Sequence, residues 1–325
     1  MGLEKEVAAN RSDIRRQASF FREPAREQTA IEQLPAVAAT VAAVTGTLEM
    51  RPYGDVIVSD GPTDEQAAPA PLGPGSTAFS EVATLSGTWT RDGRRALVEA
   101  LAGDPVGLEQ AALGSDDAAP SEANDSLIAP AQLVRAYGED TGSASVRLRA
   151  RLGARAAPVT VGEGGVYDQT DRLLARLTPD TDTDADVTIA ADEEARLTVD
   201  VTFEAVTDSD AAAITDVATI SEAPRSEAVA VPLDEVVFGT DETAPTASDT
   251  ELGARVATKA AGHRGGRDTL VVSVLLDASK PDSQPHDLVE AGARADGTLV
   301  TRLTFPAVTK DDRLRVRFDA PIQFR

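Results

Sequence analysis

The stretch GTDETAPTASDTEL, residues 239–252, has a counterpart 125 residues earlier in GSDDAAPSEANDSL, residues 114–127. In both stretches a proline follows the glycine by six residues. The aligned positions are Gly114, Pro120, Asp125 and Leu127 in the first stretch and Gly239, Pro245, either Asp249 or Thr250, and Leu252 in the second. Because the spacing stays constant through loop-like acidic sequence, we interpret the two stretches as copies of one domain.

The match continues downstream of both stretches. Glu163-Gly164-Gly165 corresponds to Glu290-Ala291-Gly292, and LLARLT (173–178) corresponds to LVTRLT (299–304). Each copy then ends in a strand of alternating apolar residues. Those residues are Leu197, Val199, Val201 and Phe203 in the first copy and Leu314, Val316 and Phe318 in the second. The sequence therefore predicts a mainly β fold of duplicated, tandem antiparallel β-sandwich-like domains, with a short N-terminal helix.

Local patterns predict further elements. SVRLRARL (145–152) alternates as a half-buried strand does, whereas TLVVSVLLD (269–277) is continuously apolar and is expected to be covered on both faces. TRDGRRALVEALAG (90–103) predicts a helix that Gly103 can end. Shorter helices are predicted at 131–137 and 252–261, and VGEGG (161–165) is interpreted as a turn.

The N-terminal region is predicted to be a docking segment. Residues 2–22 predict a helix, because its apolar residues fall on one stripe. Leu3, Val7, Ile14 and Phe21 of this stripe are the candidate partner-docking residues. A helix packed on its own domain and a disordered terminus are the alternatives. The predicted organisation is a helix and strand segment (1–60), a Pro/Gly/Ala-rich linker (61–77), a first repeat domain (78–206), a linker (207–232) and a second repeat domain (233–325).

Charge is the strongest feature of the composition. The chain has 54 acidic and 31 basic residues, a net charge of −23, and only four of the basic residues are lysines. Molar salt screens the repulsion between dense carboxylates, so this balance predicts a protein of an extreme halophile or of its virus. An ordinary acidic protein is the alternative. Such a chain is not expected to bind nucleic acid, and with no apolar run of 18 residues it is not expected to insert into a membrane.

Catalytic chemistry finds little support in the sequence. The chain has no cysteine and two histidines, His263 and His286, both expected in exposed loops. The acidic run at 180–186 fails the EF-hand pattern, since Ala185 and Ala191 stand where glycine and glutamate are needed. We therefore predict no catalytic residues, no metal site and no cofactor. A polysaccharide-degrading carboxylate pair is kept as an alternative, because carboxylates are abundant.

The repeated motifs resemble a viral family. Thr246, Asp249, Thr250 and Leu252, followed by Glu290, Gly292, Asp296, Gly297 and Leu299, are similar to the ordered signals of the N-terminal domain of phage tail-collar fibre and related tail and baseplate proteins. The first copy is preceded by TRDGR (90–94), which looks like the opening helix of that domain. The second copy has no obvious leading helix, because EAPRSEAVAVP (222–232) holds two prolines.

The resemblance implies a virion structural protein of the tail, and with the charge balance it suggests a tailed virus of a halophile. The expected partners are other tail or baseplate proteins and further copies of the chain, as a trimer or a six-fold ring, with a host surface as an additional contact. A capsid decoration or vertex turret protein is the main alternative. A secreted adhesion module is a third interpretation, which the lack of a hydrophobic signal region at the N-terminus disfavours.

Overall fold

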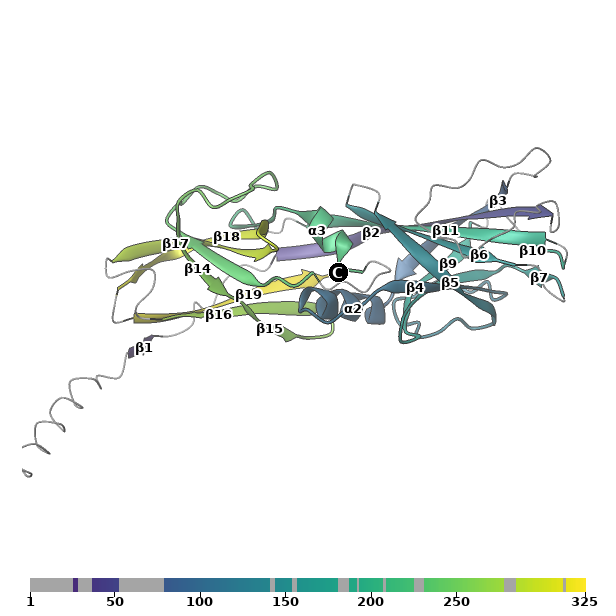
Figure 1. Cartoon of the computed structure of the whole chain (residues 1–325), viewed down its shortest axis with the longest axis horizontal. Helices are drawn as coiled ribbons and strands as arrows, with labels where there is room; N and C mark the ends of the chain where they lie inside the picture. Colours follow the sequence, from purple (N-terminus) through teal and green to yellow (C-terminus); the bar gives the residue numbers. More distant parts are fainter. Residues whose placement is uncertain are drawn as a thin grey trace, which may run out of the picture.

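In the part of the chain that the structure describes, the fold is mainly β, with largely antiparallel sheets, two short helices and an elongated outline (Figure 1). The computed structural model describes residues 26–28, 37–52, 79–140, 144–153, 157–180, 187–191, 193–206, 209–224, 231–277, 285–311 and 314–325. The predicted N-terminal helix, with Leu3, Val7, Ile14 and Phe21, and the predicted linker at 61–77 lie outside these residues.

The first half of the described chain is a curled half-barrel. Its strands are β2 (Val37–Pro52), β3 (Ser80–Trp89), β4 (Leu108–Gly114), β5 (Pro130–Asp140), β6 (Ser145–Leu152), β8 (Glu163–Asp168), β9 (Leu173–Pro179) and β11 (Glu193–Val206). They pair in the order β11-β6-β5-β4-β8-β9-β3-β2, and β2 also pairs with β11, so the series of pairings returns to its start. A separate small ribbon is formed by β7 (Val159–Thr160) and β10 (Thr188–Ile189).

The second half has two sheets that face each other. One contains β12 (Ala212–Ile214), β18 (Thr298–Lys310), β17 (His286–Ala295), β13 (Glu235–Gly239) and β14 (Arg255–Ala260), in that order. The other contains β15 (Gly262–Gly265), β16 (Thr269–Leu276) and β19 (Leu314–Phe324), joined in parallel by β1 (Arg26–Gln28) and by the start of β2. Phe238 of the first sheet meets Phe318 of the second edge to face, with ring centroids 5.4 Å apart.

Strand pairing follows the same plan in both halves. The order β4-β8-β9-β3 corresponds to β13-β17-β18-β12, and Gly114 faces Glu163 just as Gly239 faces Glu290.

A further shared feature is a strand that changes sheets. β5 pairs first with β4 and then with β6, while β14 pairs with β13 and the adjoining β15 pairs with β16. Strands that switch in this way form the corners of packed sheets.

The helix predicted at 90–103 is confirmed as α2 (Arg91–Leu101). Thr90 is its N-cap, and its hydroxyl accepts a hydrogen bond from the Gly93 N–H at 3.0 Å. The second half also has a leading helix, α3 (Val217–Glu222), capped by Asp216. The prediction that this helix is missing was wrong, because Pro224 follows the helix rather than interrupting it. In the predicted linker 207–232, the described residues therefore contain β12 and α3.

Several strand predictions are confirmed by alternating burial. Val146, Leu148, Ala150 and Leu152 of β6 are buried, as are Leu197, Val199, Val201 and Phe203 of β11 and Val316 and Phe318 of β19. β16 alternates as well, and Leu275 on its outer face is 41% exposed, so the prediction that this strand is covered on both faces was wrong.

Three further local predictions were wrong. The segments 131–137 and 252–261 form strands β5 and β14 rather than helices, because neighbouring strands offer backbone partners that outweigh weak local preference. VGEGG does not form a turn. Its last three residues begin β8, which lies between β4 and β9 and is buried throughout.

Candidate functional site: two matching buried ion-pair clusters

The first cluster lies where the loop after β4 meets β8 and β9. Arg176 of β9 places its Nε atom 2.9 Å from Glu163 Oε2 and its Nη2 atom 3.0 Å from Asp116 Oδ1. Glu163 is fully buried and also accepts hydrogen bonds from the N–H groups of Ile128, at 3.1 Å, and Ala129, at 2.7 Å. We call Asp116, Glu163 and Arg176 the first clamp.

The second cluster repeats this arrangement on β17 and β18. Arg302 Nε donates to Glu290 Oε2 at 3.0 Å, and Arg302 Nη1 donates to Asp249 Oδ2 at 2.7 Å. The fully buried Glu290 accepts hydrogen bonds from the Asp241 and Ala254 N–H groups at 3.3 and 3.2 Å. We call Asp249, Glu290 and Arg302 the second clamp.

The two clamps differ in the aspartate that binds the arginine, because the residue 125 positions after Asp116 is Asp241 and not Asp249. Arg302 Nη2 lies 2.8 Å from Glu290 Oε2 but is not oriented to make a hydrogen bond with any described residue, so this contact is electrostatic only. A third carboxylate, that of Asp241, stands 3.6 Å from the same nitrogen. Arg302 is thus surrounded by negative charge on three sides.

Glycine at 114 and 239 is required by the clamps. A Cβ at Gly114 would lie 2.5 Å from Glu163 Oε1, and a Cβ at Gly239 would collide with the Glu290 carboxylate. Gly165 and Gly292, one strand away, leave room for buried leucines. A Cβ at Gly165 would lie 2.9 Å from the Leu127 side chain, and one at Gly292 would lie 2.5 Å from the Leu299 side chain. The predicted repeat residues are therefore in contact with each other.

The remaining repeat residues have structural positions of their own. Leu127 and Leu252 are buried on the outer faces of their sheets, under the loops that carry them. Pro120 and Pro245 lie in those loops, at the surface. Gly297, with a φ of 81°, and Asp296 form the tight turn between β17 and β18.

The sequence interpretation did not single out three clamp residues, Asp116, Arg176 and Arg302. The two arginines were visible in the aligned segments LLARLT and LVTRLT, where an arginine stands between small and apolar residues at the same place. A charged residue at an inward-facing strand position, repeated in both copies, is a signal for a buried ion pair.

The second clamp shifts the pKa of two of its members, Asp249 and Arg302. Burial alone would raise the pKa of Asp249, but hydrogen bonds from Arg302 and Thr246 lower that pKa below its usual value. In the same way, Asp249 and Glu290 outweigh burial and raise the pKa of Arg302.

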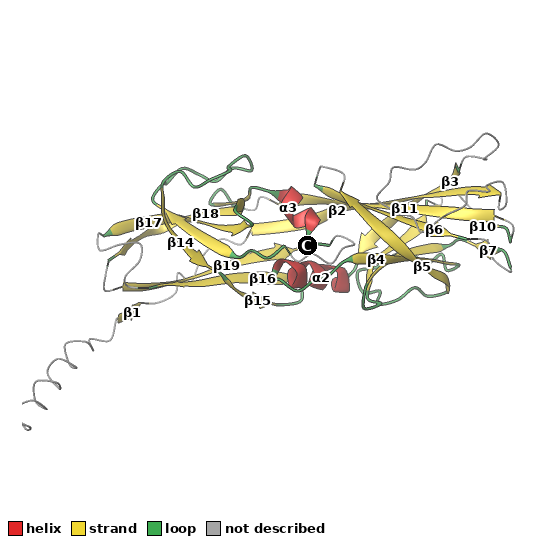
Figure 2. Ribbon diagram, viewed as in Figure 1, coloured by secondary structure: helices red, strands yellow, loops and turns green. Residues whose placement is uncertain are grey.

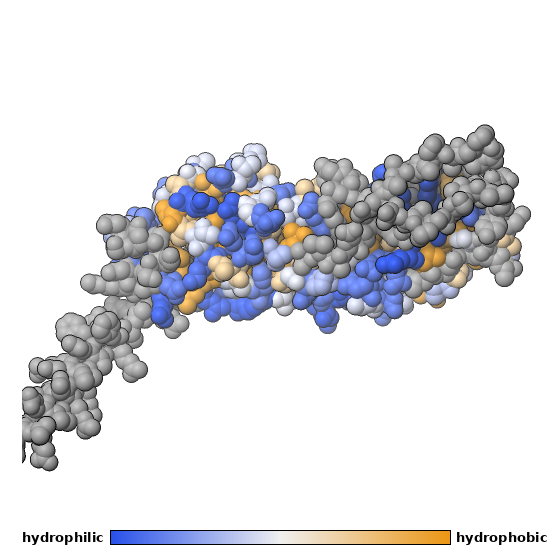
Figure 3. Space-filling view, in the orientation of Figure 1, coloured by the Kyte–Doolittle hydropathy of each residue, from blue (hydrophilic) through white to orange (hydrophobic). Residues whose placement is uncertain are grey.

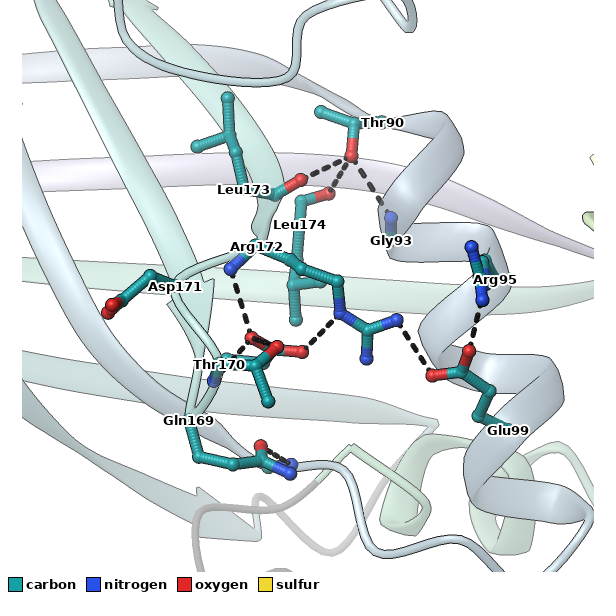
Figure 4. A network of polar contacts seen from close by, with 12 residues as sticks. Thr90, Gly93, Arg95, Glu99, Gln169, Thr170, Asp171, Arg172, Leu173 and Leu174 are labelled. Carbon is teal, nitrogen blue, oxygen red and sulfur yellow. Dashed lines mark hydrogen bonds and ion pairs between the residues drawn. The ribbon is translucent and has the colours of Figure 1, made fainter.

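A further polar network lies in the first half (Figure 4). The buried Asp168 accepts hydrogen bonds from Thr170 and from both the backbone and the side chain of Arg172. Arg172 then reaches α2 through a 2.7 Å contact with Glu99, which also pairs with Arg95. Together these contacts fasten the turn after β8 to the helix.

The two histidines are not in the exposed loops predicted for them. His263 lies in β15, half-buried, with its Nε2 atom 2.7 Å from the Leu233 carbonyl oxygen, and His286 begins β17. A groove of about 670 Å³ runs beside His263 between α2 and β15. Arg95, Glu99 and Arg267 also line it, so acidic and basic groups are mixed there.

Within the described part of the chain, no three acidic or histidine side chains are grouped so that they could hold a metal ion. Of the acidic run at 180–186, only Asp180 is among the described residues. Neither described helix is long and apolar enough to cross a membrane. The visible face of the molecule is mostly hydrophilic, with smaller apolar areas (Figure 3).

Comparison with known proteins gives no relative. No protein-family model, no curated protein and no solved structure matches this chain. Its class is therefore defined by the fold and the clamps alone, as a mainly β protein whose two halves carry the same buried cluster.

Proposed function

We propose that this chain is a structural protein of a tailed virus that infects a halophile, acting in the tail by assembly and adhesion rather than by catalysis. In this proposal the two halves are duplicated β-sandwich-like domains. Their partners are further copies of the chain and neighbouring tail or baseplate proteins, with a host surface as an additional contact.

The observation that carries the proposal is the repetition of one clamp. A glycine, a buried glutamate and a buried arginine recur in the same strand register, Gly114 with Glu163 and Arg176, and Gly239 with Glu290 and Arg302. Glu290 and Asp249 of the second clamp belong to the motifs that resemble the tail-collar domain. The clamps thus support both the duplication and the relevance of those motifs.

The energetics of the clamps favour a role in shaping loops. A buried ion pair contributes little net stability over an apolar core of equal volume, because both charges lose their hydration. Keeping two such pairs is more readily explained by the loops they hold, residues 115–129 and 240–254. Well-defined exposed loops on a rigid sheet are typical of proteins that recognise other proteins.

The charge of the chain supports the halophilic part of the proposal. The chain carries a net charge of −23 on 325 residues, so its carboxylates repel one another. This repulsion reaches over about 10 Å at 0.1 M salt but over only about 3 Å at 1 M salt. The described fold is therefore expected to need concentrated salt, as the proteins and viruses of halophiles do.

The test is the mass and symmetry of the purified chain in about 2–3 M KCl, measured by light scattering and negative-stain imaging. A trimer or a six-fold ring supports the tail proposal. A five-fold assembly would favour a capsid vertex turret, and a monomer at every concentration would contradict self-assembly. Release of sugars from host surface polysaccharide would show that the alternative enzymatic interpretation is correct.

A further inference from the structure

Each helix of the described chain packs against the opposite half. α2, from the first half, contacts β9 of its own half and also β16 and β19 of the second. α3, from the second half, contacts β18 of its own half and also β6 and β11 of the first. Because β6 and β11 correspond to β16 and β19, the two halves exchange helices reciprocally. Figure 2 shows α2 and α3 on opposite sides of the centre of the molecule.

Backbone hydrogen bonds repeat the same exchange. The Leu233 N–H donates to the Leu101 carbonyl oxygen at the end of α2, at 3.1 Å. The Leu108 N–H donates to the Pro224 carbonyl oxygen just after α3, also at 3.1 Å. Leu108 and Leu233 stand 125 residues apart, the spacing of the repeat, and both are fully buried. Each half therefore satisfies a carbonyl at the C-terminal end of the other half's helix.

The two halves also share one hydrophobic core. A single cluster of buried residues includes Leu97 and Leu101 of α2, Ile220 of α3, and both Leu108 and Leu233. Two domains joined only by a linker would have separate cores. Strand β2 strengthens the connection, since it pairs with β11 of the first half and with the end of β19 of the second.

We infer that the two halves form one cooperative body, locked by reciprocal helix exchange, so that loosening one half destabilises the other. This inference does not depend on where the chain acts, and so it goes beyond the proposed function.

The chain has a natural reporter for this coupling. Its only tryptophan, Trp89, lies in the first half, is 4% exposed, and meets Phe203 edge to face with ring centroids 6.3 Å apart. Leu299 lies in the second half, in a small cluster with Val237 and Leu252 that is separate from the shared core. A cavity at Leu299 therefore perturbs the second half without touching the shared core or the tryptophan.

The experiment compares the wild-type chain with Leu299→Ala during heating in about 2–3 M KCl. Tryptophan fluorescence reports on the first half, and far-ultraviolet circular dichroism reports on the whole chain. We expect Leu299→Ala to lower both midpoints together, by about 4–10 °C. Glu242→Gln, an exposed change in the second half, is the control and is expected to move neither midpoint.

The outcome that overturns the inference is a split transition. If circular dichroism falls in two steps while the Trp89 midpoint stays at its wild-type value, the halves unfold independently. Should Leu299→Ala fail to fold, Val237→Ala removes fewer atoms from the same cluster and is scored by the same comparison of midpoints.

Discussion

Replacing Glu163 by glutamine should be among the most damaging isosteric changes in this protein. The Glu163 carboxylate accepts from Ala129 N–H at one oxygen and from Ile128 N–H and Arg176 Nε at the other. A glutamine must turn its NH₂ group toward one of these sets of donors. Arg176, only 1% exposed at its side chain, would also lose its buried counter-charge. Breaking a buried pair from one side costs about 3–5 kcal/mol, and that is the loss of unfolding free energy that we expect.

The assay is urea unfolding in about 2–3 M KCl, with the free energy extrapolated linearly to zero urea. Glu122→Gln is the matched control, because Glu122 makes a 2.7 Å pair with Arg94 at a largely exposed position. The unfolding free energy of Glu122→Gln should fall by less than about 1 kcal/mol. The double variant Glu163→Gln with Arg176→Met should lose less unfolding free energy than the two single variants lose in sum.

A loss below about 1 kcal/mol for Glu163→Gln would refute this reasoning, because the clamp would then behave as an exposed pair does. Equal losses of unfolding free energy in Glu163→Gln and Glu122→Gln would also refute it. Glu290→Gln tests the equivalence of the two clamps and should repeat the result for Glu163→Gln.

Three further predictions concern the glycines, the pH dependence and salt. Gly114→Ala and Gly239→Ala should each destabilise the chain by about 2 kcal/mol or more, because the new Cβ collides with a clamp glutamate. Gly153→Ala is the control, since a Cβ there meets open space, and it should leave the urea midpoint of the chain nearly unchanged. Burial would raise the pKa of Asp168, but hydrogen bonds from Arg172 and Thr170 outweigh burial and lower this pKa in the folded chain. The charged carboxylate therefore stabilises the fold fully above about pH 4, the usual pKa in the unfolded chain. This stabilisation is lost as the pH falls through the folded pKa. The thermal midpoint of Asp168→Asn should thus lie below the wild-type midpoint at pH 7 and approach it by about pH 3, and a constant gap across that range would argue against the assignment. Moving the chain from about 2 M to 0.1 M KCl should lower its thermal midpoint, and a midpoint independent of salt would contradict the halophilic part of the proposal.

The strands that could be predicted are those with one buried face. In β6 and β11 the apolar residues alternate with arginine, threonine and aspartate, so the period of two is visible in the sequence alone. The helix α2 was predictable as well, because Leu97 and Leu101 share a face and Thr90 is a good cap.

The features that escaped prediction depend on distant partners. α3 has six residues, too few to show a helical period, and Pro224 after it suggested a break. The extended form of β14 follows from its pairing with β13, which the segment 252–261 does not reveal by itself. Burial of Arg176 and Arg302 depends on glutamates one strand away, so it follows from the register rather than from the local sequence.

The position of β2 affects the order in which the chain can fold during synthesis. β2 is synthesised well before its long antiparallel partner β11, and Ala39 pairs with Phe324, which is synthesised later still. Pairings across such sequence distances form slowly, since the intervening chain must first be ordered. Until residue 206 is made, β2 has no β11 to pair with, and an uncovered strand edge is prone to pair with other chains. We therefore expect the nascent chain to be prone to aggregation between the synthesis of β2 and that of β11.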